Sequence, residues 1–96
     1  MIIGKVVGSA VATLKHDLLR TTKLLLVCRA DPHGTLINEP FLAVDLVDAG
    51  VGEMVIISQG SSARVATGHN ASPVDAAIIG ILDSLQVQEA IDSRKD

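Results

Sequence analysis

Alternation between apolar and polar residues at the N-terminus constrains the fold of this chain more than any other feature. The even positions from Ile2 to Leu14 are all small or apolar, whereas Lys5 and Ser9 fall on odd positions. Side chains of a β-strand point alternately to its two faces, so period-two patterning over this run predicts one bent strand. Gly4 and Gly8 permit the bending that a barrel strand needs.

Shorter segments further along the chain also favour strands. The predicted strands are Leu24–Val27, Phe41–Val47, Glu53–Ser58 and Ile78–Val87. The first is continuously apolar, which is typical of a strand covered on both sides, and the second alternates. A chain of 96 residues with five strands and no internal repeat predicts one all-β domain. We expect an OB-like barrel of the partly open type, with one short helix.

The connections between these segments carry turn signals. Asp31–Gly34 suits a type I turn, with Asp first, Pro second and Gly fourth, and the loop is predicted to continue through Thr35–Pro40. Small and polar residues over Gly60–Thr67 predict another loop. Ser72 followed by Pro73 is a helix-start signal, so the short helix is predicted to begin there.

Composition indicates a core without large anchors. Apolar residues make up 48% of the chain, yet Phe41 is its one aromatic residue. A chain this short buries only roughly 60–68% of its unfolded surface, so the surplus of aliphatic residues suggests buried faces beyond one core, such as contacts between copies. Cys28 stands alone inside an apolar run and is expected to pack as a small hydrophobe.

Charge argues against a nucleic-acid partner, and the short apolar stretches argue against a membrane partner. The chain has 8 basic and 11 acidic residues, a formal charge of −3, and no clustering of Lys and Arg. Nucleic-acid binding needs a basic footprint or stacking aromatics, and the sequence provides neither. No stretch approaches the roughly 20 apolar residues of a membrane span, and the N-terminus lacks a leader pattern. We therefore expect a cytoplasmic protein with no nucleic-acid or membrane partner.

Two segments resemble catalytic or cofactor motifs only in part. Gly50–Gly52 begins a dinucleotide fingerprint, but Val55 stands where the third glycine belongs and a strand follows where a helix is required. Ser61 and Ser62 lie in the same region as the potential partners His69 and Asp75, but the G-x-S-x-G elbow is absent. Both segments are interpreted as structural loops.

Potential metal ligands and acid–base pairs are equally weak. The histidines fall in separate predicted loops, at His16, His33 and His69. With a single cysteine, no C-x-x-C or H-x-x-x-H spacing supports zinc. The carboxylates Asp45, Asp48 and Glu53 cluster in sequence without signs of a lined pocket. We expect no catalytic residue, no cofactor and no metal.

An ordered set of segments carries a family resemblance. The segments are Met1–Gly8, Ala12–His16, Lys23–Val27, Val44–Asp45, Ala49–Glu53, Gly60–Arg64 and Val74–Asp83. Their order and spacing resemble the EutN/CcmL family of bacterial microcompartment vertex proteins. The resemblance runs from Met1 to about Val87 and leaves residues 88–96 as a polar tail.

The resemblance implies a five-stranded barrel with a short helix, assembled as a homopentamer. Such pentamers occupy the fivefold corners of a polyhedral shell, beside hexameric shell proteins. It therefore implies a structural shell protein, not an enzyme, located in a microcompartment shell in the cytoplasm.

The same resemblance nominates residues for the subunit interface or the central axis. They are Asp48, Ala49, Gly50, Val51, Gly52 and Glu53 in one loop, and Gly60, Ser61, Ser62 and Arg64 in another. Asp48 stands where the family usually has a glycine, and Thr21–Thr22 where a glycine turn is common. Asp tolerates left-handed backbone angles better than most residues.

Two other functions remain open from the residues alone. A barrel of this class also suits a binding module for an oligonucleotide or small ligand. The third alternative is a small hydrolase that uses the Ser61–Ser62 loop.

Overall fold

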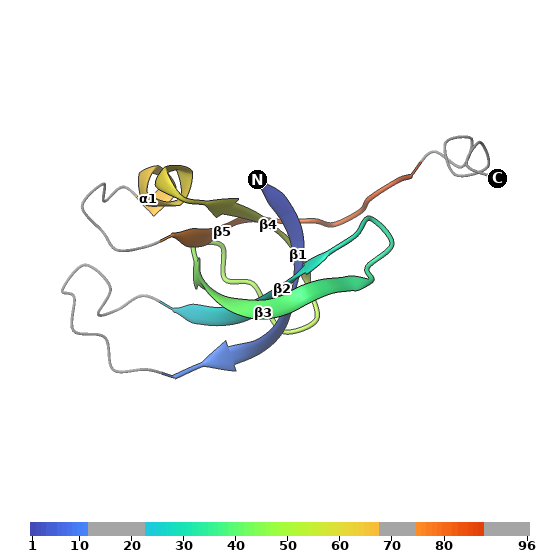
Figure 1. Ribbon diagram of the computed structural model, residues 1–96, viewed down its shortest axis with the longest axis horizontal. Helices are drawn as coiled ribbons and strands as arrows, with labels where there is room; N and C mark the ends of the chain where they lie inside the picture. Colours follow the sequence, from blue (N-terminus) through green and yellow to red (C-terminus); the bar gives the residue numbers. More distant parts are fainter. Residues whose placement is uncertain (12–22, 68–74, 88–96) are drawn as a thin grey trace.

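A computed structural model describes residues 1–11, 23–67 and 75–87, which form a closed barrel with one helix (Figure 1). The elements are β1 (Ile2–Ala10), β2 (Leu24–Ala30), β3 (Leu36–Asp45), β4 (Met54–Gln59), α1 (Ser61–Thr67) and β5 (Ala76–Ile81). Around the barrel the strand order is β1-β2-β3-β5-β4. The predicted all-β barrel of five strands with one short helix is confirmed.

The barrel closes at its shortest seam. All neighbouring strands are antiparallel except β3 and β5, which run parallel through two pairs, Val44 with Ala77 and Asp45 with Ile78. The N–H of Leu46 extends this seam by donating to the carbonyl of Ile78 at 3.2 Å. The partly open barrel that we expected is therefore closed, although by only a few bonds.

Strand β1 changes face at a β-bulge. Ile2 packs against the core and Val6 lies in it, so even positions point inward before the bulge. The register shifts between Val6 and Gly8, and Gly8 and Ala10 then pair with outward-pointing residues of β2. The extra residue of the bulge reverses which positions of the strand point outward. The strand ends at Ala10, and the predicted continuation to Leu14 lies largely outside the described residues.

Aliphatic side chains alone make up the centre of the core. The largest fully buried side chains are Leu25, Ile57, Ile78, Val6, Val27 and Val55. Phe41 is only partly buried and packs against this cluster from its edge. Cys28 is buried, and its Sγ lies 3.4 Å from the carbonyl oxygen of Asn38, so the expected packing role is confirmed.

Strand β3 is longer than the sequence indicates. It begins at Leu36, inside the segment predicted to be a loop, and Ile37 pairs with Arg29 of β2. A bulge absorbs the irregular residues that follow, with Asn38 at φ 67°. Pro40 suggested a loop, but proline is accepted in a strand where its missing N–H is not needed.

The one helix among the described residues lies in a segment that we predicted to be a loop. Helix α1 occupies Ser61–Thr67, where we expected a loop, and its Ala63 is fully buried beside Val44 and Ala77. The predicted start at Ser72–Pro73 lies outside the described residues, and β5 begins at Ala76, two residues before its predicted start. The burial of Ala63 depends on tertiary contacts, so no local sequence pattern predicts this helix.

The segment after β5 leaves the barrel. The strand ends at Ile81, not at Val87 as predicted. The N–H of Leu82 still donates to the carbonyl of Met54 at 2.9 Å, and the chain then runs away from the barrel beside the β2–β3 hairpin (Figure 1). That hairpin closes with the predicted turn, in which Oδ1 of Asp31 accepts the N–H groups of His33 and Thr35, both at 2.9 Å. These bonds, first from Thr35 and then from His33, lower the pKa of Asp31.

Candidate functional site

Asp45 fixes the start of the connection that contains the first group of predicted interface residues. Its side chain has no exposed area, and its carboxylate accepts the N–H of Val47 at 3.1 Å and that of Ala49 at 3.0 Å. The ammonium of Lys23 lies 3.4 Å from the same carboxylate. The backbone therefore folds around a buried anion that it helps to neutralise.

Lys23 joins this anchor to Asp48. Its Nζ donates to Oδ1 of Asp48 at 3.2 Å and to the carbonyl of Ala49 at 3.1 Å. The hydrogen bond to Asp48 raises the pKa of Lys23 above its ordinary value, and the bond to Asp45 acts in the same direction. Asp48 has φ 58°, the left-handed conformation that glycine would adopt most readily at this place.

The tip of the connection is held by a compact set of hydrogen bonds. The N–H of Gly50 donates to Oε1 of Glu53 at 2.6 Å, and the N–H of Glu53 returns to the carbonyl of Gly50 at 3.1 Å. Gly52 has φ 94° and donates its N–H to the carbonyl of Val6 at 2.8 Å. This fixed turn presents Val51, which is 65% exposed.

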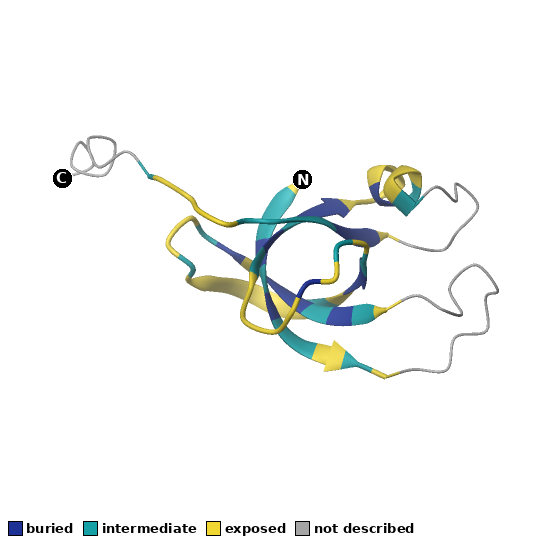
Figure 2. Cartoon of the chain, turned by 180° about the vertical axis from the view of Figure 1, so that it is seen from behind, coloured by how far each residue is buried: buried dark blue, intermediate teal, exposed yellow. Residues whose placement is uncertain are grey.

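Ala49 differs from its neighbours in the same group. It is buried in the core of its own chain, whereas Asp48, Gly50, Val51, Gly52 and Glu53 are exposed. Figure 2 shows the connection crossing the barrel opening as alternating buried and exposed segments. The side chain of Ala49 therefore anchors the connection rather than facing outward.

The second predicted group lies at the start of α1. Gly60 has φ 64° and donates its N–H to the carbonyl of Asp75 at 2.8 Å. Ser61 and Ser62 follow on the surface, and Arg64 is half-buried. The structure thus attaches this group to the start of β5, and the first group to β1 and Lys23.

In the described residues, the carboxylates in and beside the first group take part in hydrogen bonds and ion pairs that hold the fold. Asp45 and Glu53 accept backbone N–H groups and Asp48 pairs with Lys23, so each carboxylate already has a partner. Gly50–Gly52 leads into strand β4 and not into a helix that would receive a pyrophosphate. Across residues 1–11, 23–67 and 75–87, no group of three or more His, Cys, Asp and Glu could hold a metal ion. The hydrolase alternative needs His69, which lies outside the described residues.

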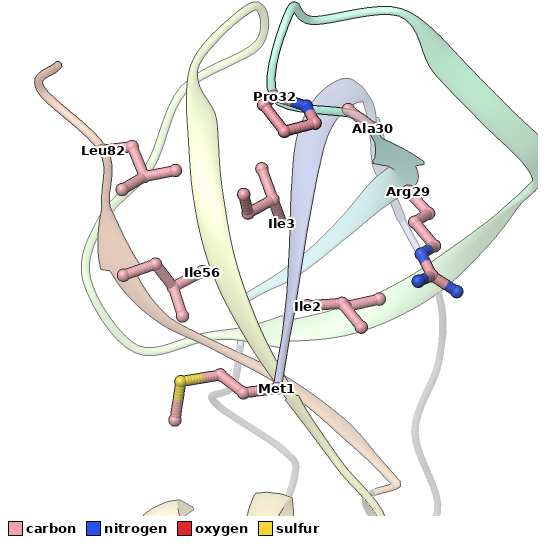
Figure 3. A pocket seen from close by; sticks show the side chains of 8 residues that line it. All are labelled: Met1, Ile2, Ile3, Arg29, Ala30, Pro32, Ile56 and Leu82. Atoms are coloured by element: carbon pink, nitrogen blue, oxygen red, sulfur yellow. The ribbon is translucent and has the colours of Figure 1, made fainter. Parts of the chain in front are cut away.

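A pocket that the sequence did not predict lies around the start of β1. It has a volume of about 480 Å³ and is lined by Met1, Ile2, Ile3, Arg29, Ala30, Pro32, Ile56 and Leu82 (Figure 3). These residues come from distant parts of the chain, so no local sequence pattern indicated the pocket. Among the described helices, none is long and apolar enough to span a membrane.

Comparisons with known proteins agree on one family. The family model described as "Ethanolamine utilisation protein EutN/carboxysome" matches residues 1–83. The microcompartment shell vertex protein GrpN of Rhodospirillum rubrum is 45% identical over 90% of this chain and 97% of its own length. The carboxysome shell vertex protein CcmL of a Nostoc species is 44% identical over the whole chain and 97% of its own length.

The solved structures show the same likeness in three dimensions. A structure titled as the GrpN pentameric microcompartment shell protein from Rhodospirillum rubrum superposes with a TM-score of 0.82 and 42% identity. The match covers 92% of this chain and 100% of that one. Sequence and fold agree over nearly the full length, and the chain therefore belongs to the EutN/CcmL family.

Proposed function

We propose that this chain is a structural subunit of a bacterial microcompartment shell, in which it forms homopentamers that close the fivefold vertices. The observation that carries the proposal is the fold match over the full length of a protein that is itself described as a pentameric shell protein. Hexagonal tiles alone make flat sheets, so a closed shell needs fivefold units at its corners. The similarity favours this function over an OB-like binding module, which the strand order alone leaves open.

The two groups of predicted interface residues suit contacts within such a ring. Val51 and the serines of α1 are exposed on backbone that is already held by hydrogen bonds. A preorganised surface loses little conformational entropy on association, which favours tight packing between copies. We place Gly50, Gly52 and Arg64 at this boundary, with hexameric shell proteins as the outer neighbours of the ring.

Substitutions at Gly52 and Arg64 test the placement of the boundary. Gly52→Leu puts a bulky side chain at φ 94° and is expected to hinder ring closure while each subunit stays folded. Arg64→Ala is expected to cost about 2–5 kcal/mol of association if its charged contact is buried between subunits. Sedimentation velocity measures both effects, with circular dichroism to verify folding.

Gly34→Leu is the matched control for Gly52→Leu. Gly34 has φ 88°, and neither glycine has an atom within 4 Å of an added Cβ, so the backbone strain is similar. Gly34 lies in the β2–β3 turn, away from both groups. Equal loss of rings in the two variants would show that strain alone, and not the position of Gly52, weakens assembly.

Deletion of the gene in its host tests the function itself. We expect compartments that are misshapen or leaky, whereas the enzymes purified from inside them keep their activity. Electron microscopy of the compartments and assays of the released enzymes measure the two effects. Normal closed compartments in the deletion strain would contradict the proposal, as would enzymes that need this chain for activity.

A further inference from the structure

Strand β3 has a free edge along the half that belongs to the β2–β3 hairpin. On one side β3 pairs with β2 from Leu36 to Val44, whereas on the other side β5 joins it only at Val44 and Asp45. Within the described part of the chain, no strand pairs with that other side from Leu36 to Ala43. In Figure 1 this half of β3 lies away from the short strand β5. An open edge of this kind is a template on which another chain can add a strand.

The side chains along this edge make strand addition favourable. Leu36, Ile37 and Leu42 are large apolar residues with exposed fractions of 48%, 37% and 49%. The segment from Leu36 to Leu42 carries a single charge, at Glu39. Exposed apolar residues with little charge on an unpaired strand are typical of segments that aggregate edge to edge. The chain therefore needs a feature that keeps this edge from pairing.

Backbone hydrogen bonds show which residues of β3 direct their polar groups toward this edge. The N–H of Asp45 donates to the carbonyl of Lys23 at 2.9 Å, so Asp45 faces the β2 side. In an antiparallel ladder, alternate residues direct their N–H and C=O groups toward the partner strand. Ala43 and Phe41 therefore also face β2, and the residues between them face the opposite side.

Pro40 belongs to the set that faces the free side. The N–H of Leu46 donates to the carbonyl of Ile78 in β5 at 3.2 Å, which shows that this alternating set points away from β2. Leu42 and Pro40 precede Leu46 in the same set, beyond the end of β5. Leu42 offers an N–H to the free side, but the ring nitrogen of Pro40 has no hydrogen to donate. The proline thus removes one donor from the edge without removing a bond to β2.

A β-bulge beside Pro40 bends the same edge. Asn38 has φ 67°, and Sγ of Cys28 donates to its carbonyl oxygen at 3.4 Å where the register between β2 and β3 shifts. Glu39 lies exposed between Asn38 and Pro40 and adds a charge. Proline, a bulge and a charged side chain are features by which natural edge strands avoid pairing with other chains.

We propose that Pro40, together with the bulge at Asn38 and Glu39, prevents the free edge of β3 from pairing with the same edge of a second copy. Any other residue in place of Pro40 would add an N–H beside that of Leu42 on the free side. Two copies could then align these segments antiparallel and bond through both donors. This inference goes beyond the proposed function and does not depend on it.

Pro40→Thr tests the inference, because threonine restores the donor and favours strands. The wild type and the variant are incubated at equal concentration below their melting temperatures, and thioflavin T fluorescence and light scattering are followed over time. We expect the wild type to stay clear and Pro40→Thr to gain fluorescence and large particles. Pro32→Thr is the matched control, because Pro32 is an exposed proline in the β2–β3 turn and not on the edge. It is expected to behave like the wild type.

A second variant separates edge pairing from unfolding. Leu42→Lys, added to Pro40→Thr, puts a cation on the edge, and lysine opposes the pairing of edge strands. The double variant is expected to stay clear even where urea denaturation shows it to be no more stable than Pro40→Thr. Hydrogen exchange locates the contact, because the amide of Leu42 should be protected in the particles of Pro40→Thr but not in the wild type.

Four results would overturn the inference. They are a folded Pro40→Thr that stays clear, a double variant that aggregates as much as Pro40→Thr, a Pro32→Thr control that aggregates to the same extent, and particles in which the Leu42 amide exchanges freely. Native mass spectrometry of the wild type reports on rings separately. Failure of the proposed function therefore cannot be mistaken for failure of this inference.

Discussion

Replacing the buried Asp45 by alanine is expected to destabilise the fold more than any other change to a charged side chain of the described residues. The carboxylate accepts the N–H groups of Val47 and Ala49 inside the connection between β3 and β4. Alanine would leave both donors without an acceptor, and a buried unsatisfied donor costs about 1–3 kcal/mol. The expected loss in the free energy of unfolding is therefore about 2–6 kcal/mol.

Urea denaturation followed by circular dichroism measures this loss, at a fixed protein concentration because assembly also contributes to stability. For a domain of this size each kcal/mol lowers the melting temperature by about 4–8 °C, so thermal melts should show a drop of at least about 8 °C. Asp45→Asn keeps one acceptor oxygen and should fall between the wild type and Asp45→Ala. Asp48→Asn is the control, because its side chain is 95% exposed and Asn also tolerates left-handed angles.

An unfolding free energy of Asp45→Ala within about 1 kcal/mol of the wild type would refute the reasoning. It would mean that the freed N–H groups find water or other acceptors. A loss as large in Asp48→Asn would also refute it, because the backbone conformation at Asp48 would then matter more than the buried carboxylate.

Two further changes probe other parts of the barrel. Gly4→Ala is expected to destabilise the fold by about 1–3 kcal/mol in urea denaturation, because the added Cβ would lie 2.5 Å from Cδ1 of Ile57 in the core. An unchanged midpoint would show that the core has room there. Asp31→Ala is expected to lower the melting temperature at neutral pH, because hydrogen bonds in the fold lower the pKa of Asp31 below 3.8. That contribution is present above the unfolded pKa and is lost as the pH falls through the folded pKa, so the gap to the wild type should narrow below about pH 4. A gap that stays constant from neutral to acid pH would contradict this assignment.

Local sequence patterns predicted the strands better than their extent. The apolar run at the start of β2 and the alternation in the second half of β3 were sufficient to place those strands. The bulge in β1 and the first half of β3 were missed because pairing with a distant strand decides them. Helix α1 was missed for the same reason, since the burial of Ala63 depends on β3 and β5.

The candidate site shows a similar division. The positive φ at Asp48 agrees with the family resemblance, which places a glycine there. The role of Asp45 could not be predicted, because it depends on Lys23, which is far away in the sequence, and on backbone groups of its own connection. The pocket could not be predicted, because its lining residues are far apart in the sequence and meet only in the fold.

Native mass spectrometry of the wild-type chain, over a range of protein concentrations, tests the central claim most directly. The account predicts a dominant species of five chains that dissociates to monomers without a stable dimer, because each copy binds its neighbours through two different surfaces. A chain that stays monomeric at every concentration, or that stops at a symmetric dimer, would contradict it.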